Sequence, residues 1–146
     1  MTAVTILNFS HPLTETQLAR IRELTAEDEL QVFDIKTHFD NAQPFGPQLE
    51  KLIASIPLDS HQLQTEPILI VPPALNFITA MFLAVLHGLM GYFPPMVRIR
   101  PAADSLTQRF EVAEIIDLQA LRDAALARRY DHKDAKASQK STTTAP

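Results

Sequence analysis

The feature that most constrains this chain is an apolar stretch from Pro67 to Gly91, interrupted by two adjacent prolines. Residues 68–71 (Ile-Leu-Ile-Val) lack polar alternation and are rich in β-branched side chains, which is typical of a strand buried on both faces. Pro72-Pro73 ends this strand, because neither ring nitrogen can donate a hydrogen bond to a sheet. Leu75–Gly91 is then almost entirely apolar. The stretch predicts a central strand followed by a helix that covers the sheet.

The same helix must be weighed against a membrane span. Residues 75–93 approach the length of about 18 apolar residues at which a spanning helix is considered. Asn76, His87 and two glycines interrupt them, and strand signals lie on both sides. We therefore expect a helix that lies on a sheet.

The composition indicates one globular domain. The chain has 146 residues, of which 46% are hydrophobic and 21% charged, enough for a single core. It contains no cysteine, which excludes disulfides and thiolate zinc sites. No basic region precedes an apolar run at the N-terminus, so we expect no signal peptide and a cytoplasmic protein.

The charge argues against a general nucleic-acid binder. The net charge is −4, and residues 131–146 contribute +1, which leaves −5 for the rest of the chain. Binding to the phosphate backbone of DNA or RNA normally requires a basic surface. Any anion bound by this chain must therefore be met at a small local site.

Strands and helices alternate along the chain. Further strands are predicted at 4–9, 30–35, 96–100 and 109–116. Thr14 and Gln17 form a capping-box pattern at the start of one helix, and a second helix begins near Pro47. A last helix follows Asp117, with an inward face of Leu118, Leu121, Ala125 and Leu126. Residues 58–66 are predicted as a polar connection and residues 131–146 as a disordered tail.

This order predicts an α/β fold. Alternating strands and helices favour right-handed crossovers and a mainly parallel sheet of about five strands with helices on both faces. The predicted architecture is a Rossmann-like three-layer sandwich formed by residues 1–130.

Polar clusters follow three of the predicted strands. In open parallel sheets, ligands bind outside the carboxyl ends of the strands. The clusters at these ends are Asn8-Phe9-Ser10-His11, His38-Phe39-Asp40 and the segment Pro72–Asn76, which includes Pro73. If the strands are parallel, all three clusters share one edge of the sheet.

Residues of these types suit a nucleotide. A helix N-terminus near Ser10 and His11 would favour an anion, and Ser10 could donate to a phosphate. Asn8 and Asn76 could bind a purine edge, and Phe39 could stack on the base. Each residue also has a structural alternative: Ser10 in local capping, His11 in solvent, Phe9 in the core, and His38–Asp40 as a simple turn.

Other motifs are weak or absent. Arg98 and Arg100 project to one face of their predicted strand, where they either bind phosphate or form a solvated edge. His87 is best explained as a core or interface residue, and no two histidines have the spacing of metal ligands. With three glycines, the chain has no dinucleotide fingerprint and no phosphate loop, and we expect neither metal nor cofactor.

Several motifs resemble one known family. They are Leu7-Asn8-Phe9-Ser10-His11-Pro12-Leu13-Thr14, Phe39-Asp40 with Gln43-Pro44-Phe45, Pro72-Pro73, Leu86-His87-Gly88 with Met90-Gly91, and residues 110–116 (Phe-Glu-Val-Ala-Glu-Ile-Ile). Across residues 4–129 the chain is similar to the CRISPR-associated Csx-fifteen family, and the opening motif is the most specific of these. The resemblance implies a small accessory protein of type III CRISPR systems, with a CARF-like fold akin to domains that sense cyclic oligoadenylates.

The resemblance leaves three functions open. The first is a module that holds cyclic tetra-adenylate between two copies of the chain and lowers its free level; Ser10, His11 and Arg98 of each copy would meet half of the ring. The second is a metal-independent ring nuclease in which a ribose 2′-hydroxyl attacks the adjacent phosphodiester, with His11 or His38 as acid or base. The third is an interaction scaffold without a ligand. No DNA or membrane partner is expected.

Overall fold

The fold is built on one five-stranded sheet. The computed structural model describes residues 3–103 and 106–141. The spatial order of the strands is β2-β1-β3-β4-β5. β1 to β4 run parallel, and β5 runs antiparallel to β4. The strands are β1 (Val4–Asn8), β2 (Leu30–Asp34), β3 (Ile68–Val71), β4 (Met96–Pro101) and β5 (Phe110–Ile116).

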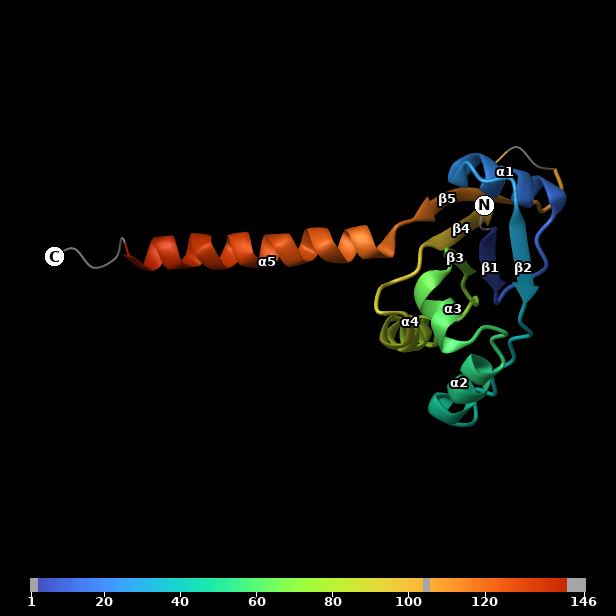
Figure 1. The fold of residues 1–146 in the computed structure, drawn as a ribbon, viewed down its shortest axis with the longest axis horizontal. Helices are drawn as coiled ribbons and strands as arrows, with labels where there is room; N and C mark the ends of the chain where they lie inside the picture. Colours follow the sequence, from blue (N-terminus) through green and yellow to red (C-terminus); the bar gives the residue numbers. More distant parts are fainter. Residues whose placement is uncertain (1–2, 104–105, 142–146) are drawn as a thin grey trace.

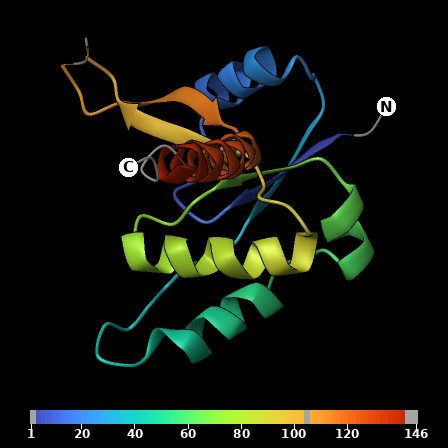
Figure 2. The same cartoon turned by 90° about the vertical axis from the view of Figure 1, so that its left-hand side faces the viewer.

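Helices cover both faces of this sheet (Figures 1 and 2). α1 (Glu15–Thr25) lies on one face, while α2 (Phe45–Ala54), α3 (Ser60–Thr65) and α4 (Asn76–Met90) lie on the other. The predicted α/β class and the Rossmann-like three-layer arrangement are therefore confirmed. Among the helices of the described residues, none is long and apolar enough to cross a bilayer.

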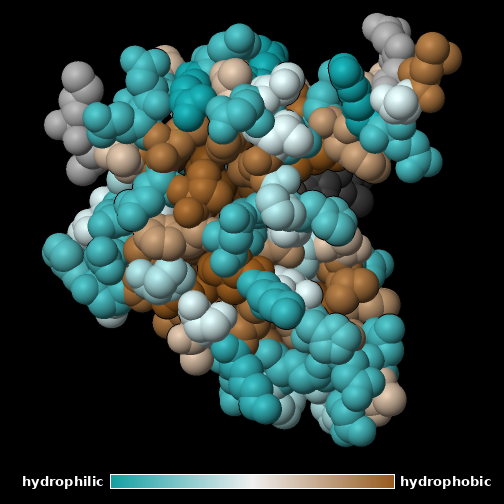
Figure 3. Space-filling view, turned by 90° about the vertical axis from the view of Figure 1, so that its right-hand side faces the viewer, coloured by the Kyte–Doolittle hydropathy of each residue, from teal (hydrophilic) through white to brown (hydrophobic). Residues whose placement is uncertain are grey.

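The central strands separate two hydrophobic clusters. Side chains of β3 alternate between the faces: Ile68 and Ile70 pack with α2, α3 and α4, whereas Leu69 and Val71 pack on the α1 side. All four are buried, as the apolar run predicted. The β2 edge is less covered, and Figure 3 shows apolar side chains across the middle of that side, between the levels of α1 and α2.

Local capping signals determine where two helices begin. The Thr14 side chain accepts from the Gln17 backbone N–H and the Gln17 side chain accepts from the Thr14 N–H, which confirms the predicted capping box of α1. Asp59 and Gln62 make the same pair of bonds at the start of α3. Residues 58–66 were predicted as a polar connection, so α3 was missed, although Asp59 and Gln62 form the same capping-box pattern as Thr14 and Gln17.

The last helix differs most from its prediction. α5 (Leu118–Ser141) extends away from the body of the molecule (Figure 1) and continues into the segment predicted as a disordered tail. The predicted inward face of Leu118, Leu121, Ala125 and Leu126 was wrong for Leu121, which is 61% exposed, and for Ala125, which is exposed, whereas Leu118 and Leu126 are half-buried. Because β5 is antiparallel, it returns the chain to the start of β4, and α5 leaves the sheet there.

Candidate functional site

A cavity of about 340 Å³ lies at the carboxyl ends of three adjacent strands. Its lining comes from the segments after β1, β2 and β3: Phe9, Ser10 and His11; Ile35, Lys36 and Thr37; and Pro73, Ala74 and Leu75. β1 is followed by a helix on one face of the sheet and β3 by a helix on the other. The cavity, called the edge pocket below, thus lies at the point where the strand order reverses, which is the usual ligand position in such sheets.

Asn8 shapes the loop that forms one wall of this pocket. Its side chain is fully buried; Nδ2 donates to the carbonyl of His11 at 2.9 Å and to Oδ1 of Asp34 at 2.8 Å. Oδ1 accepts from the backbone N–H of Ser10 at 3.1 Å. Both amide hydrogens are used inside the protein, so Asn8 holds Ser10 and His11 in position and has no donor left for a purine.

The polar lining of the edge pocket suits an anion. Ser10, His11, Lys36 and Thr37 supply donors, and none of the lining residues is acidic. Within the described residues, the side chains of Ser10, His11 and Lys36 form no hydrogen bond or ion pair, whereas the Thr37 hydroxyl donates to the carbonyl of Ile35. The Lys36 ammonium is therefore available to a negatively charged ligand.

The start of α4 also favours an anion in the edge pocket. Ala74 and Leu75 line the pocket directly before this helix, and Leu75 at its N-cap provides no side-chain hydrogen bond. Of the first backbone N–H groups, that of Phe77 donates to Oδ1 of Asn76. The helix dipole adds partial positive charge here, although a helix terminus alone would be a weak anion site.

Two predicted residues form apolar parts of the pocket. The Phe9 ring is 2% exposed and packs edge-on against Phe82, with ring centroids 4.4 Å apart. Pro73 is buried behind the turn that follows β3. Phe9 is therefore primarily a core residue, which was the alternative weighed from the sequence.

Besides the buried Asn8, five predicted residues do not line the edge pocket. Phe39 packs against Phe45 and the core cluster. The Asp40 side chain accepts from the N–H of Ala42 in a turn. His38 and Asn76 are exposed, and each lies one residue beyond a segment that lines the pocket. Arg98 lies on β4 and pairs with Glu114 at 2.7 Å. The structure brings together the clusters after β1 and β3 as expected, but it draws on the first residues after β2 rather than on His38–Asp40.

Lys36 and Thr37 were missed as site residues. The signal was available, because both directly follow a strand predicted to be parallel and so belong to the same edge as Ser10. His38 and Phe39, farther along the loop, were predicted instead, because their side-chain types suit phosphate and purine contacts.

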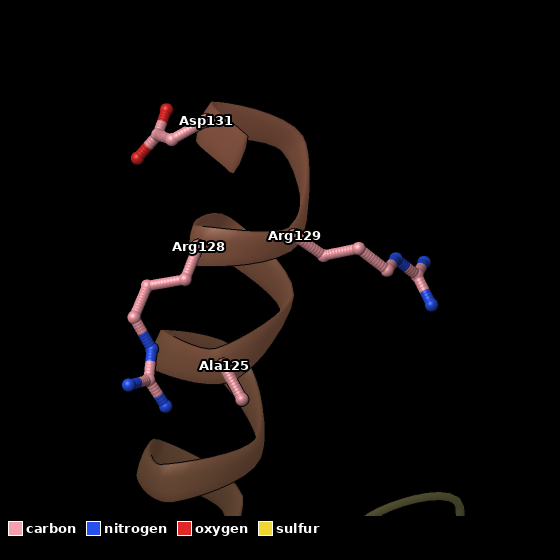
Figure 4. Close-up of a pocket in the computed structure, with 4 residues that line it drawn as sticks. All are labelled: Ala125, Arg128, Arg129 and Asp131. Atoms are coloured by element: carbon pink, nitrogen blue, oxygen red, sulfur yellow. The ribbon is translucent and has the colours of Figure 1, made fainter. Parts of the chain in front are cut away.

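A larger open space of about 630 Å³ lies beside α5. It is lined by Ala125, Arg128, Arg129 and Asp131 of this one helix, and Figure 4 shows that the two arginines point to different sides. A surface with residues from a single helix encloses no ligand. Across residues 3–103 and 106–141, no group of three or more histidine or acidic side chains is arranged to hold a metal ion.

Comparisons with protein-family models, curated proteins and solved structures found no match to this chain.

Proposed function

We propose that this protein binds a cyclic oligoadenylate, cyclic tetra-adenylate, and lowers its free concentration in the cytoplasm, which would damp type III CRISPR signalling. The observation that carries the proposal is the edge pocket: it lies at the switch point of the sheet, has no acidic lining, and contains a lysine that forms no ion pair with the described residues. Phe9, Ser10 and His11 form one wall of it, and they belong to the motif on which the family resemblance is most specific.

The lining suits the two parts of a nucleotide. Ser10, His11 and Lys36 would donate to a phosphate, close to the positive end of the α4 dipole. Leu75 is 41% exposed and offers an apolar surface to an adenine ring. A polyanion can thus bind to a body with negative net charge through a local set of donors.

The size of the pocket supports sharing of the ligand. Its volume of about 340 Å³ is near the lower end of the roughly 300–1,000 Å³ found for small-molecule sites. A ring of four nucleotides exceeds that space, so one pocket would take one part of the ring. A second copy related by two-fold symmetry would bind the opposite part with the same residues.

A ring nuclease is the second candidate, and His11 is the observation that favours it. His11 lines the pocket and its side chain has no hydrogen-bond partner among the described residues. An imidazole beside the phosphate could take a proton from a ribose 2′-hydroxyl that attacks the adjacent phosphodiester. Lys36 is the other acid or base that lines the pocket, and no carboxylate or second histidine does, which makes binding without cleavage the favoured function.

One titration distinguishes the two candidates. Labelled cyclic tetra-adenylate is mixed with the full chain, and bound ligand and linear products are followed over hours. Saturable retention without products supports sequestration, and many turnovers per protein support the nuclease. Absence of binding at micromolar concentrations contradicts both.

Variants of the pocket sharpen this test. Lys36→Gln should weaken binding about tenfold or more, because a charge-assisted hydrogen bond contributes roughly 1.5–3 kcal/mol. Ser10→Ala and His11→Ala should also weaken binding. Lys51→Gln, which removes an exposed lysine from α2, is the matched control and should bind as the wild type does. Equal affinity in all four variants would exclude the edge pocket.

A further inference from the structure

The outward side of α4 is an apolar surface that no other described residue covers. The helix contains no Asp, Glu, Lys or Arg. Ile78, Phe82, Leu86 and Met90 face the core, whereas Phe77, Ala80, Ala84 and Gly88 recur at helical spacing on the opposite side and are exposed. Phe77 is 71% exposed, which is unusual for so large a side chain in a folded body.

α5 is a second element with an exposed apolar residue, Leu121, and it projects from its own body. It begins near the start of β4, where Oε1 of Gln119 accepts from the backbone N–H of Phe93 at 2.8 Å, and then projects away from the sheet. Leu118, Leu121 and Ala125 fall on one side of this helix. Many alanines and basic residues favour the helical state, but they do not explain why Leu121 should be 61% exposed to water.

The charges of α5 and of the body are complementary. Residues 118–141 contain six Lys and Arg and three Asp, which gives +3, whereas residues 1–117 contain seven Lys and Arg and fourteen Asp and Glu, which gives −7. Arg128 and Arg129 form no ion pair within the described residues. A helix of this charge would be attracted to the body of another copy.

We propose that α5 of one copy packs along the outward side of α4 of a second copy, and that the exchange is reciprocal in a two-fold symmetric dimer. Leu118, Leu121 and Ala125 would cover Phe77, Ala80 and Ala84 of the other copy. The small residues allow the two helix backbones to approach closely, and the flanking arginines meet an acidic body.

The dimensions permit this arrangement. With a rise of 1.5 Å per residue, the 24 residues of α5 span about 36 Å and the 15 residues of α4 about 22 Å. α5 is therefore long enough to cross the whole of the partner's α4. Figure 2, viewed along α5, shows this helix projecting from the same side of the molecule on which α4 lies, so one partner can contact both.

The dimer does not depend on the proposed ligand. Its surface consists of α4 and α5, whereas the edge pocket is formed by segments after β1, β2 and β3. Failure of the dimer would leave the pocket proposal in place, and failure of ligand binding would leave the dimer in place.

The first test is the mass of the full chain in solution without ligand, measured by sedimentation at several concentrations. The wild type should be a dimer at micromolar concentration. Leu121→Asp and Ala84→Arg should each shift it to monomer, because both residues are exposed in the single chain and neither change disturbs its core. The circular dichroism spectra of both variants should match that of the folded wild type.

Matched controls use exposed positions of the same residue types elsewhere in the chain. Leu106→Asp changes a fully exposed leucine between β4 and β5, and Ala54→Arg changes an exposed alanine at the end of α2. Both should remain dimeric. A monomeric wild type would overturn the proposal, and it is the result expected if another protein or a lipid surface covers α4. Dimers in Leu121→Asp and Ala84→Arg would also overturn it.

Crosslinking tests the pairing itself. The chain has no cysteine, so Ala84→Cys and Ala125→Cys introduce unique thiols. A mixture of the two variants, treated with a short bifunctional thiol reagent, should give a mixed dimer in high yield. Dimers formed only by Ala84→Cys with itself would show α4 against α4 and would contradict the exchange of α5.

Discussion

At the residue scale, the arrangement of the edge pocket depends on a side chain that does not contact the ligand space. Asn8 is fully buried and bonds to three neighbours: Ser10, His11 and Asp34. Its position at the end of a buried strand was evident from the sequence. Its partners were not, because Asp34 lies on the neighbouring strand β2, and that contact exists only once the two strands pair in register.

Asn8→Ala should lower the free energy of unfolding by roughly 3 kcal/mol, since each lost hydrogen bond costs about 1 kcal/mol and its partners are left unpaired. Urea unfolding measures this value. Asn41→Ala, at an exposed position in the loop before α2, should change stability by less than about 0.5 kcal/mol. A loss under 1 kcal/mol in Asn8→Ala would contradict the structural role given to the side chain.

Tyr92 makes the stability of the folded chain depend on pH in the alkaline range. Its hydroxyl donates to the carbonyl of Glu66 at 3.4 Å, and burial raises the pKa of the phenol above its usual value of 10.0. The unfolded chain therefore loses this proton at lower pH than the folded chain does. The contribution of Tyr92 to stability is complete below pH 10 and decreases as the pH rises beyond it.

Comparison of unfolding at pH 9 and pH 11 tests this effect. The wild type should lose more stability over this interval than Tyr92→Phe does. Tyr130→Phe, which alters a tyrosine that is 60% exposed, should lose as much as the wild type. Equal losses in all three proteins would remove Tyr92 as the cause.

At the element scale, local signals predicted where most helices and strands lie, but not what they contact. The capping box of α1 and the apolar strand β3 were predicted because their causes lie within a few residues. The apolar stripe of α5 was predicted as an inward face, and the structure leaves Leu121 and Ala125 of this stripe exposed. Periodicity indicates that one side of a helix is apolar; it does not identify the surface that covers that side.

Gly91 ends α4, and its backbone explains why glycine is present. Its φ is +85°, in the left-handed region, and a Cβ there would meet no atom within 4 Å. Gly91→Ala should therefore destabilise the protein by roughly 1–2 kcal/mol through backbone strain alone.

The matched change is Gly46→Ala in α2, where a Cβ also meets no atom and φ is not positive. It should leave stability unchanged or raise it by up to about 1 kcal/mol, because alanine favours the helix more than glycine does. Thermal unfolding of both variants measures the difference. Equal stability of the two would contradict the account of the α4 terminus.

At the scale of the whole molecule, the sheet order brings the candidate site together. Residues 9–11, 35–37 and 73–75 are far apart in sequence and meet because β2, β1 and β3 are neighbours and parallel. The alternation of strands and helices predicted a shared edge but not the strand order, which depends on long-range pairing. Arg98 was grouped with the site from its residue type, yet it lies on β4 and pairs with Glu114 of β5.

The most direct measurement of the central claim is a map of backbone amide signals by nuclear magnetic resonance during titration with cyclic tetra-adenylate. The account predicts that the largest shifts occur at Ser10, His11, Lys36, Thr37 and Leu75, and that they saturate together. The arginine-bearing strand β4 should show small changes. Shifts centred on Arg98 and Arg100, or no shifts at all, would contradict ligand binding at the edge pocket.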